Sequence, residues 1–212
     1  MNRIFVLVTA EHQERLGVLL CEESSRFLTL FVIRTGLLFV SAVSPFLNTA
    51  TAETRTMLTC LPRSICSWDF RIRGTTGGEA NLTFNWFTEQ GTVEWNGTVY
   101  DVVKHGPFSG HWTLEGPEGV VIEAQKTSAF ARRFELESDS GPITLQALSI
   151  FTRAFELLQT GSVVGTITPM HPFTRRATIQ CQARVDELTQ LFAFWLVVIT
   201  WKRAARNNHR NT

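Results

Sequence analysis

The hydrophobic and polar positions divide the chain into parts with different periodicities. From Cys66 to about Gln182, short alternating apolar stretches are separated by glycine, proline and asparagine breaks. Breaks at intervals of about 8–12 residues are typical of antiparallel sandwiches and barrels. The pair Asn96–Gly97 predicts a tight hairpin, because both central positions of a type I′ turn have positive φ. This part of the chain is therefore predicted to be mainly β.

The segment from about Val185 to Arg206 instead has the spacing of an α-helix. Its apolar residues recur every three or four positions, at Leu188, Leu191, Phe192, Trp195, Leu196 and Ile199. The opposite face is apolar as well, so the helix is either buried in protein or spans a membrane. The apolar run Leu191–Trp201 would extend only about 16 Å, whereas a bilayer needs about 20 residues. We therefore predict that the helix is buried in the protein.

The strand region contains an internal repeat with an offset of 43 residues. Trp112–Leu114 corresponds to Phe155–Leu157, Val120–Val121 to Val163–Val164, and Phe130–Arg133 to Phe173–Arg176. Two related strand modules favour a barrel, because closure removes the exposed edges of each half. A helix of about 10 Å diameter needs a wide barrel around it. The predicted fold is a closed antiparallel β-barrel of about twelve strands around the buried C-terminal helix.

The N-terminal part of the chain has no consistent pattern. Its stretch Leu28–Leu47 is apolar but contains Arg34, which costs about 2.5–3.5 kcal/mol at the centre of a membrane helix. The stretch is either a membrane anchor or an export signal with Ala50–Ala52 as its cleavage motif. A third alternative is that translation begins at Met57. The predicted organisation is a leader at residues 1–62, a barrel domain at 66–206 with its helix at 185–206, and a polar tail at 207–212.

Composition narrows the function classes. The chain has 20 Lys and Arg against 19 Asp and Glu, so it lacks the strongly basic balance of nucleic-acid-binding domains. It contains no glycine-rich phosphate loop, no nucleophile elbow and no paired acid and base. The four cysteines, Cys21, Cys60, Cys66 and Cys181, do not have the spacing of a zinc site, and free thiols are favoured over a disulfide. We therefore expect no catalytic residues, no metal and no cofactor.

The repeated strand modules, the Phe-x-Arg-Arg turns and the apolar segment Gln190–Leu196 resemble the tubby C-terminal-like superfamily, from about Ser67 to Arg206. This superfamily includes tubby-like proteins, phospholipid scramblases and plant LURP-one-related proteins, and the scramblase-like branch is nearest. The resemblance implies a twelve-stranded barrel around a C-terminal helix. Tubby-like proteins bind phosphoinositide headgroups through basic residues on such a barrel.

One departure from the scramblase pattern changes the expected function. Scramblases have an acidic calcium-binding stretch before the C-terminal helix, where this chain has Gln180–Glu187. This segment has too few oxygen ligands for a calcium loop. Calcium-triggered scrambling is therefore not expected.

Basic side chains cluster at equivalent turns of the two strand modules. They are Lys126, Arg132 and Arg133 in the first module, and Arg175 and Arg176 in the second. Guanidinium groups bind phosphate bidentately and lysine adds a point charge, so these residues are the candidate site for an anionic ligand. The alternative is that they form surface ion pairs with Glu123, Glu135 or Glu137.

These observations predict a non-enzymatic binding module that binds anionic phospholipid headgroups, or a protein partner, through its basic turns. Its expected location is the cytoplasm, with peripheral attachment to a membrane. The alternative is a membrane-embedded lipid-handling protein of scramblase type, inserted through the C-terminal helix or anchored around Leu28–Leu47. A hydrolase with an unrecognised site is a third interpretation.

Overall fold

The computed structural model describes residues 31–32, 38–39, 54–74, 78–85, 87–128 and 131–210. The chain divides into two compact units, residues 1–52 and 53–212. In the first unit the described residues form two short antiparallel strands, β1 (Phe31–Val32) and β2 (Leu38–Phe39). The rest of the stretch Leu28–Leu47, which carries the predicted anchor, lies outside the described residues, as does the predicted cleavage motif.

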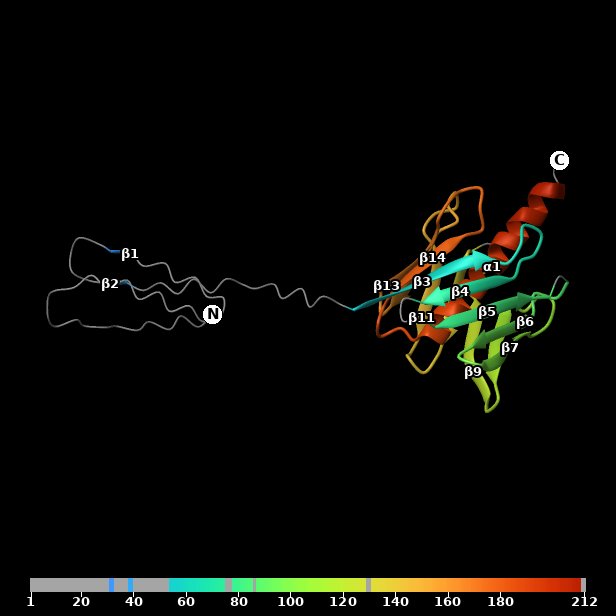
Figure 1. The fold of residues 1–212 in the computed structure, drawn as a ribbon, viewed down its shortest axis with the longest axis horizontal. Helices are drawn as coiled ribbons and strands as arrows, with labels where there is room; N and C mark the ends of the chain where they lie inside the picture. The colour runs from blue at the N-terminus through green and yellow to red at the C-terminus, as the bar shows by residue number, and fades with distance from the viewer. Residues whose placement is uncertain are drawn as a thin grey trace. The chain divides into compact units, whose positions relative to one another are not determined.

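The second unit is a closed antiparallel barrel of twelve strands with the helix α1 (Glu187–Arg210), so the predicted fold is confirmed (Figure 1). Each strand pairs with its neighbours in the sequence, and β3 pairs with β14 to close the barrel. The strands are β3 (Arg55–Pro62), β4 (Phe70–Gly74), β5 (Glu79–Phe84), β6 (Gly91–Trp95), β7 (Thr98–Lys104), β8 (His111–Gly116), β9 (Gly119–Lys126), β10 (Arg133–Glu137), β11 (Ile143–Ala147), β12 (Phe155–Gln159), β13 (Ser162–Pro169) and β14 (Ala177–Gln182).

The barrel begins at Arg55, earlier than the predicted boundary at residue 66. Strand β3 falls within the predicted leader at residues 1–62, but it lies between β14 and β4 and completes the barrel. Only Leu58 and Cys60 of this strand are buried, so its alternating pattern is too short to be distinctive. The boundary could not be placed because the partner β14 lies more than a hundred residues away in the chain.

Two-residue turns join several strands, including the turn that the sequence predicts at Asn96–Gly97. Asn96 and Gly97 connect β6 to β7 with φ angles of 49° and 78°. Thr160 and Gly161 connect β12 to β13 with φ angles of 50° and 80°. Positive φ at both central positions matches the right-handed twist of the paired strands, so these turns set the register of their hairpins.

The offset of 43 residues seen in the sequence also relates the backbone registers of two strand triplets. In β8 and β9, Leu114 pairs with Ile122, and a bulge follows Leu114. In β12 and β13, Leu157 pairs with Gly165, and a bulge follows Leu157. The pairing of β9 with β10 is likewise matched by that of β13 with β14. Equivalent turns of the two triplets therefore lie at the same end of the barrel.

Helix α1 is capped at its start and buried on all sides along its middle. Asp186 accepts hydrogen bonds from the backbone N–H and the hydroxyl of Thr189, at 2.7 and 2.6 Å, which satisfies an otherwise unpaired donor of the first turn. Every residue from Leu191 to Ile199 is at most 1% exposed. Trp195 stacks on Phe84 of β5, with ring centroids 3.6 Å apart. The prediction of a buried helix is therefore confirmed.

The helix extends further than predicted, since residues 207–210 of the predicted polar tail continue it. Lys202 and Arg203 therefore lie about two turns before its C-terminal end, too far for the interaction with the helix dipole that acts within the last turn. Among the described residues, no helix has both the length and the apolar character needed to cross a bilayer.

Candidate functional site: a basic hollow at one end of the barrel

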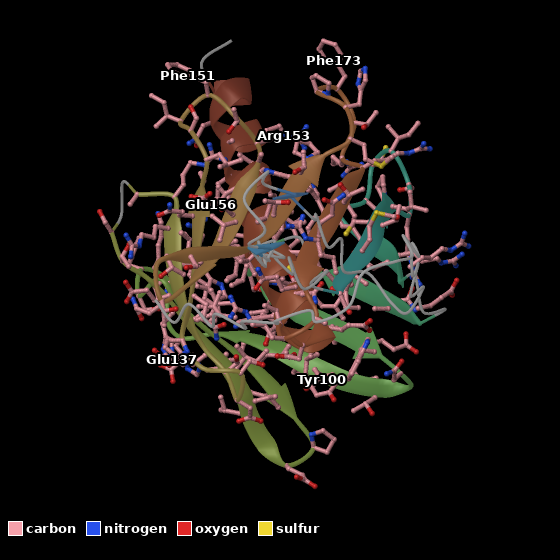
Figure 2. The ribbon with its side chains drawn as sticks, turned by 90° about the vertical axis from the view of Figure 1, so that its left-hand side faces the viewer. Tyr100, Glu137, Phe151, Arg153, Glu156 and Phe173 are labelled. Atoms are coloured by element: carbon pink, nitrogen blue, oxygen red, sulfur yellow. The ribbon has the colours of Figure 1, made fainter. Side chains whose placement is uncertain are left out.

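Alternate connections of an antiparallel barrel lie at the same end, and here the two ends differ. We call one set the loop rim; it consists of the described parts of the connections at residues 63–69, 85–90, 105–110, 127–132, 148–154 and 170–176. The C-terminal part of α1 reaches this end, where Lys202 Nζ donates to the carbonyl of Asn85 at 3.0 Å. Figure 2 shows Phe151 and Phe173 of the rim beside the end of α1, with Tyr100 and Glu137 at the other end of the barrel.

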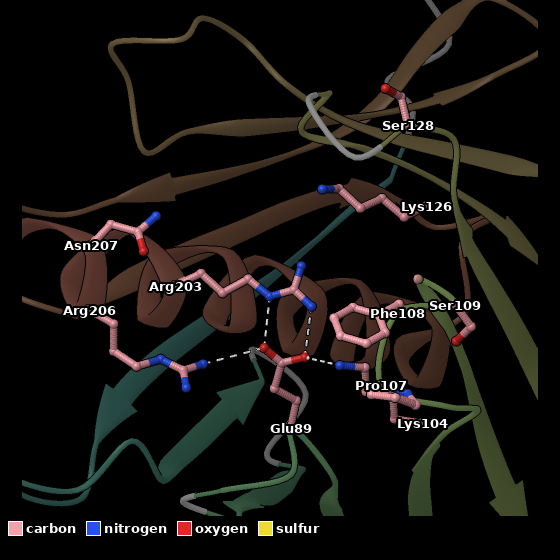
Figure 3. Close-up of a pocket in the computed structure, with 11 residues that line it drawn as sticks. Glu89, Lys104, Pro107, Phe108, Ser109, Lys126, Ser128, Arg203, Arg206 and Asn207 are labelled. Atoms are coloured by element: carbon pink, nitrogen blue, oxygen red, sulfur yellow. Dashed lines mark hydrogen bonds and ion pairs between the residues drawn. The ribbon is translucent and has the colours of Figure 1, made fainter. Parts of the chain in front are cut away.

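A buried carboxylate holds the end of α1 to the rim. Glu89 is 6% exposed and lies between β5 and β6. Arg203 donates two hydrogen bonds of 2.7 Å to the Glu89 carboxylate in a bidentate arrangement. Lys104 Nζ lies 2.8 Å from the same carboxylate and Arg206 Nη2 lies 3.4 Å from it (Figure 3). Buried carboxylates need such partners, because leaving the charge uncompensated is costly.

The ion pairs around Glu89 control its charge and its backbone. Burial would raise the pKa of this carboxyl, but hydrogen bonds from Arg203 and Lys104, with their positive charges, lower the pKa to about 2. Glu89 is therefore ionised at neutral pH. Its φ of 58° lies in the left-handed region, which costs a non-glycine residue roughly 1–2 kcal/mol. The interactions of the carboxylate offset this strain.

Two adjoining hollows open at the loop rim. The first has a volume of about 480 Å³ and contains the Glu89 cluster (Figure 3). The second has a volume of about 880 Å³ and lies beside the last turns of α1. Lys126, Arg203 and Asn207 line both. The cationic side chains that line one or both hollows are Lys104, Lys126, Arg132, Arg153, Arg175, Arg203 and Arg206. Among the described residues that line the hollows, Glu89 is the only carboxylate.

Three of the five sequence-predicted basic residues come together here. Lys126, Arg132 and Arg175 line the second hollow. Arg133 and Arg176 are exposed and line neither hollow. Arg133 has its guanidinium 3.9 Å from Glu135, as in the surface ion-pair alternative. The sequence pattern finds the correct turns but does not separate the residue facing the hollow from its neighbour.

Arg132 and Arg175 bind loop backbone, which was not expected from the sequence. Arg132 Nη1 donates to the carbonyl of Thr152 at 2.8 Å, and Arg175 donates to the carbonyls of Ser64, Ile65 and Ser67. Each guanidinium also lies over an aromatic ring, Phe155 for Arg132 and Trp68 for Arg175. Burial lowers the pKa of both, although arginine stays protonated at neutral pH.

Four cationic residues of the hollows were not predicted as ligand-binding residues. Arg203 and Arg206 follow the apolar run of the helix together with Lys202, and this basic cluster is the signal that could have found them. Lys104 and Arg153 give no signal, because neither belongs to a basic cluster in the sequence. Arg153 repeats the pattern of Arg132 and Arg175, since it donates to the carbonyls of Pro172 and Thr174, both at 3.0 Å.

Metal and thiol chemistry have no evident site among the described residues. No group of three or more His, Cys, Asp or Glu side chains in that part of the chain is placed to hold a metal ion. Cys60, Cys66 and Cys181 are free, and burial raises the pKa of Cys60 and raises that of Cys181 to about 12. These two buried thiols are therefore unreactive at neutral pH.

Comparisons of the chain with protein-family models, curated proteins and solved structures find no significant match.

Proposed function

We propose that the chain is a non-enzymatic binding module that docks on anionic lipid headgroups through the basic hollows of the loop rim. One observation carries the proposal: in the described part of the chain, seven cationic side chains line the two hollows against a single carboxylate, although the net charge of the chain is +1. Glu89 offsets only one of these charges. The remainder gives the rim a local positive field, which attracts an anionic surface.

The shape of the hollows suits a headgroup. Both are open to solvent at the rim, and arginine donors with lysine point charges are the groups that bind phosphate in proteins. The resemblance to the tubby C-terminal-like superfamily supports the same ligand class, because tubby-like proteins bind phosphoinositides. The proposal makes the protein a peripheral membrane protein with its loop rim toward the lipid.

The membrane-embedded alternative gains no support from α1. Its apolar residues pack inside the barrel against the strands, so inserting them in a bilayer would empty the core. An anchor within Leu28–Leu47 lies outside the described residues. We therefore keep peripheral binding as the proposed function.

The test is co-sedimentation of the full chain with vesicles of phosphatidylcholine alone, or with about 30% phosphatidylserine or a phosphoinositide added. The variant Lys126→Gln/Arg206→Gln removes two charges from the hollows while keeping Arg203 on Glu89. The matched control, Arg55→Gln/Arg73→Gln, removes two charges from exposed positions near the opposite end. Surface charges contribute about 1 kcal/mol each to binding, so we expect roughly a tenfold or greater loss for the first variant only. Equal losses in both variants would contradict binding at the hollows.

A further inference from the structure

The loop rim presents large apolar side chains to solvent from five separate loops. Ile65 is 95% exposed, Phe87 89%, Phe108 98%, Phe151 90% and Phe173 92%. Ile150, beside Phe151, is 80% exposed. The described turns at the opposite end, at residues 96–97, 117–118, 138–142, 160–161 and 183–186, carry no exposed large apolar side chain. Exposed apolar groups gathered at one end of a molecule mark an interaction surface.

Below these tips, basic side chains donate hydrogen bonds to backbone carbonyls of the loops. Arg175 donates hydrogen bonds to the carbonyls of residues 64, 65 and 67. Arg132 donates to the carbonyls of residues 149, 150 and 152, and Arg153 donates to those of residues 172 and 174. Lys202 donates a hydrogen bond to the carbonyl of Asn85, which lies in the same loop as Phe87. Several carbonyls in four of the five tip-bearing loops are thus hydrogen-bonded by basic side chains.

Carbonyls that already accept a hydrogen bond lower the free-energy cost of moving a loop from water into a bilayer. In hydrocarbon, an unpaired carbonyl costs several kcal/mol because no water is present. A loop whose carbonyls are already bound by an arginine avoids much of this cost. Figure 2 shows the result for one loop pair, with Phe151 and Phe173 projecting at the barrel end and Arg153 lying below them.

We propose that the rim tips, Ile65, Phe87, Phe108, Phe151 and Phe173, insert into the interfacial region of an anionic bilayer while the hollows between them hold headgroups. This inference rests on the proposed function and adds the depth and orientation of binding. The order of the two kinds of side chain supports this inference, because the apolar tips lie outermost and the cationic hollows lie beneath them. This order matches the acyl chains and the charged headgroups of a bilayer. A protein groove would be matched by a continuous apolar patch, whereas here charged hollows separate the tips.

The first test replaces two tips in the full chain. Phe151→Ser/Phe173→Ser changes two side chains that are almost fully exposed, so folding is expected to be unaffected. Val99→Ser/Val120→Ser is the control; these residues are 55% and 59% exposed on strands β7 and β9. Each phenylalanine adds a large apolar surface to the inserted area. Binding to phosphatidylserine-containing vesicles is expected to fall roughly tenfold or more for the tip variant and less than about twofold for the control.

The second test measures depth with a fluorophore. Cys66 is exposed beside Ile65, whereas Cys60 and Cys181 are buried, so Cys21→Ser leaves Cys66 as the accessible thiol. An environment-sensitive nitrobenzoxadiazole label there is expected to shift to the blue on binding and to be quenched by nitroxide-labelled lipids. The same label on Val120→Cys, with Cys66→Ser added, reports from the opposite end and is expected not to change.

The outcomes separate the two proposals. Loss of binding in the tip variant together with a blue shift at Cys66 supports insertion. Vesicle binding that needs Lys126 and Arg206 but not Phe151 and Phe173, with no shift at Cys66, overturns insertion and leaves headgroup binding intact. Absence of binding by the wild type to every vesicle overturns both proposals.

Discussion

Arg203 and Glu89 form a two-pronged ion pair across 114 positions of the chain, with Nε–Oε1 and Nη2–Oε2 distances of 2.7 Å. The pair ties the last turns of α1, the element threaded through the barrel, to the loop between β5 and β6. It also places one carboxylate among the cations of the first hollow. The negative charge of Glu89 reduces the repulsion between these cations in the folded protein. Structure and proposed binding surface therefore share the same residues.

Glu89 should make stability depend on pH at the acidic end. Its pKa is lowered to about 2 in the folded protein from an ordinary value of 4.5, so the folded state binds fewer protons than the unfolded state between these values. The stabilisation is therefore fully present above about pH 4.5 and is lost as pH falls toward 2. The full effect is on the order of 3 kcal/mol.

Urea unfolding from pH 7 to pH 2, for the wild type and Glu89→Gln, measures this contribution. The variant is expected to be less stable by about 3 kcal/mol at pH 7, and the difference should shrink toward pH 2. Glu118→Gln, in an exposed turn, serves as the control for loss of a carboxylate. A difference that is constant across this pH range would refute the assigned pKa.

Gly91 should be irreplaceable because a Cβ there would collide with the backbone of β5 and with the helix inside the barrel. A Cβ at this position would lie 1.9 Å from the carbonyl oxygen of Thr83 and 2.6 Å from the ring of Trp195. Gly91→Ala is therefore expected to destabilise the protein by more than about 2 kcal/mol, as overpacking of a core does. Gly97→Ala has open space around its Cβ and only a positive φ of 78°, so about 1 kcal/mol is expected. Thermal melts that rank the two variants in the opposite order would argue against the packing of Trp195 on β6.

Arg153 should control the order of the loop that carries Phe173. It donates to two carbonyls of that loop and lies 4.3 Å from the ring centroid of Trp201. Arg153→Gln is expected to speed hydrogen exchange at the amides of Met170 and Thr174, while global stability falls by about 1–2 kcal/mol. Arg153→Lys should rescue only in part, because an ammonium lacks the planar fork. Unchanged exchange in Arg153→Gln, or an equal change in Arg176→Gln, would count against this anchoring role.

The position of β3 predicts where the barrel can be shortened. Residues 54–212 retain the pairing of β3 with β14 and β4, and also the hydrogen bond of 2.8 Å from Ala183 N–H to the carbonyl of Thr54, which precedes β3. A chain that starts at Met57 loses Arg55 and Thr56, and with Thr56 a partner of the buried Gln190 amide at 3.0 Å. Unfolding in urea should show the shorter chain to be less stable by about 2 kcal/mol. Equal stability would mean that the first residues of β3 contribute nothing to closure.

The barrel architecture and the local features of this protein could be predicted from its sequence, whereas individual long-range contacts could not. The helix around Trp195 and the turn at Asn96–Gly97 depend on nearby residues, so the local sequence is enough to predict both. Strand β3 becomes recognisable only through its pairing with β14. The Phe-x-Arg-Arg turns indicated the basic end, but Glu89 and Lys104 join it through the meeting of separate loops, which no local pattern encodes.

The central claim is most directly tested by the partition of the wild-type full chain between water and vesicles, with and without anionic lipid, at two salt concentrations. The account predicts binding at least about tenfold tighter to vesicles with 30% phosphatidylserine than to phosphatidylcholine alone, and weaker binding at 0.5 M than at 0.1 M salt. Equal partition into both kinds of vesicle, or none into either, would contradict the assignment of the loop rim to an anionic membrane surface.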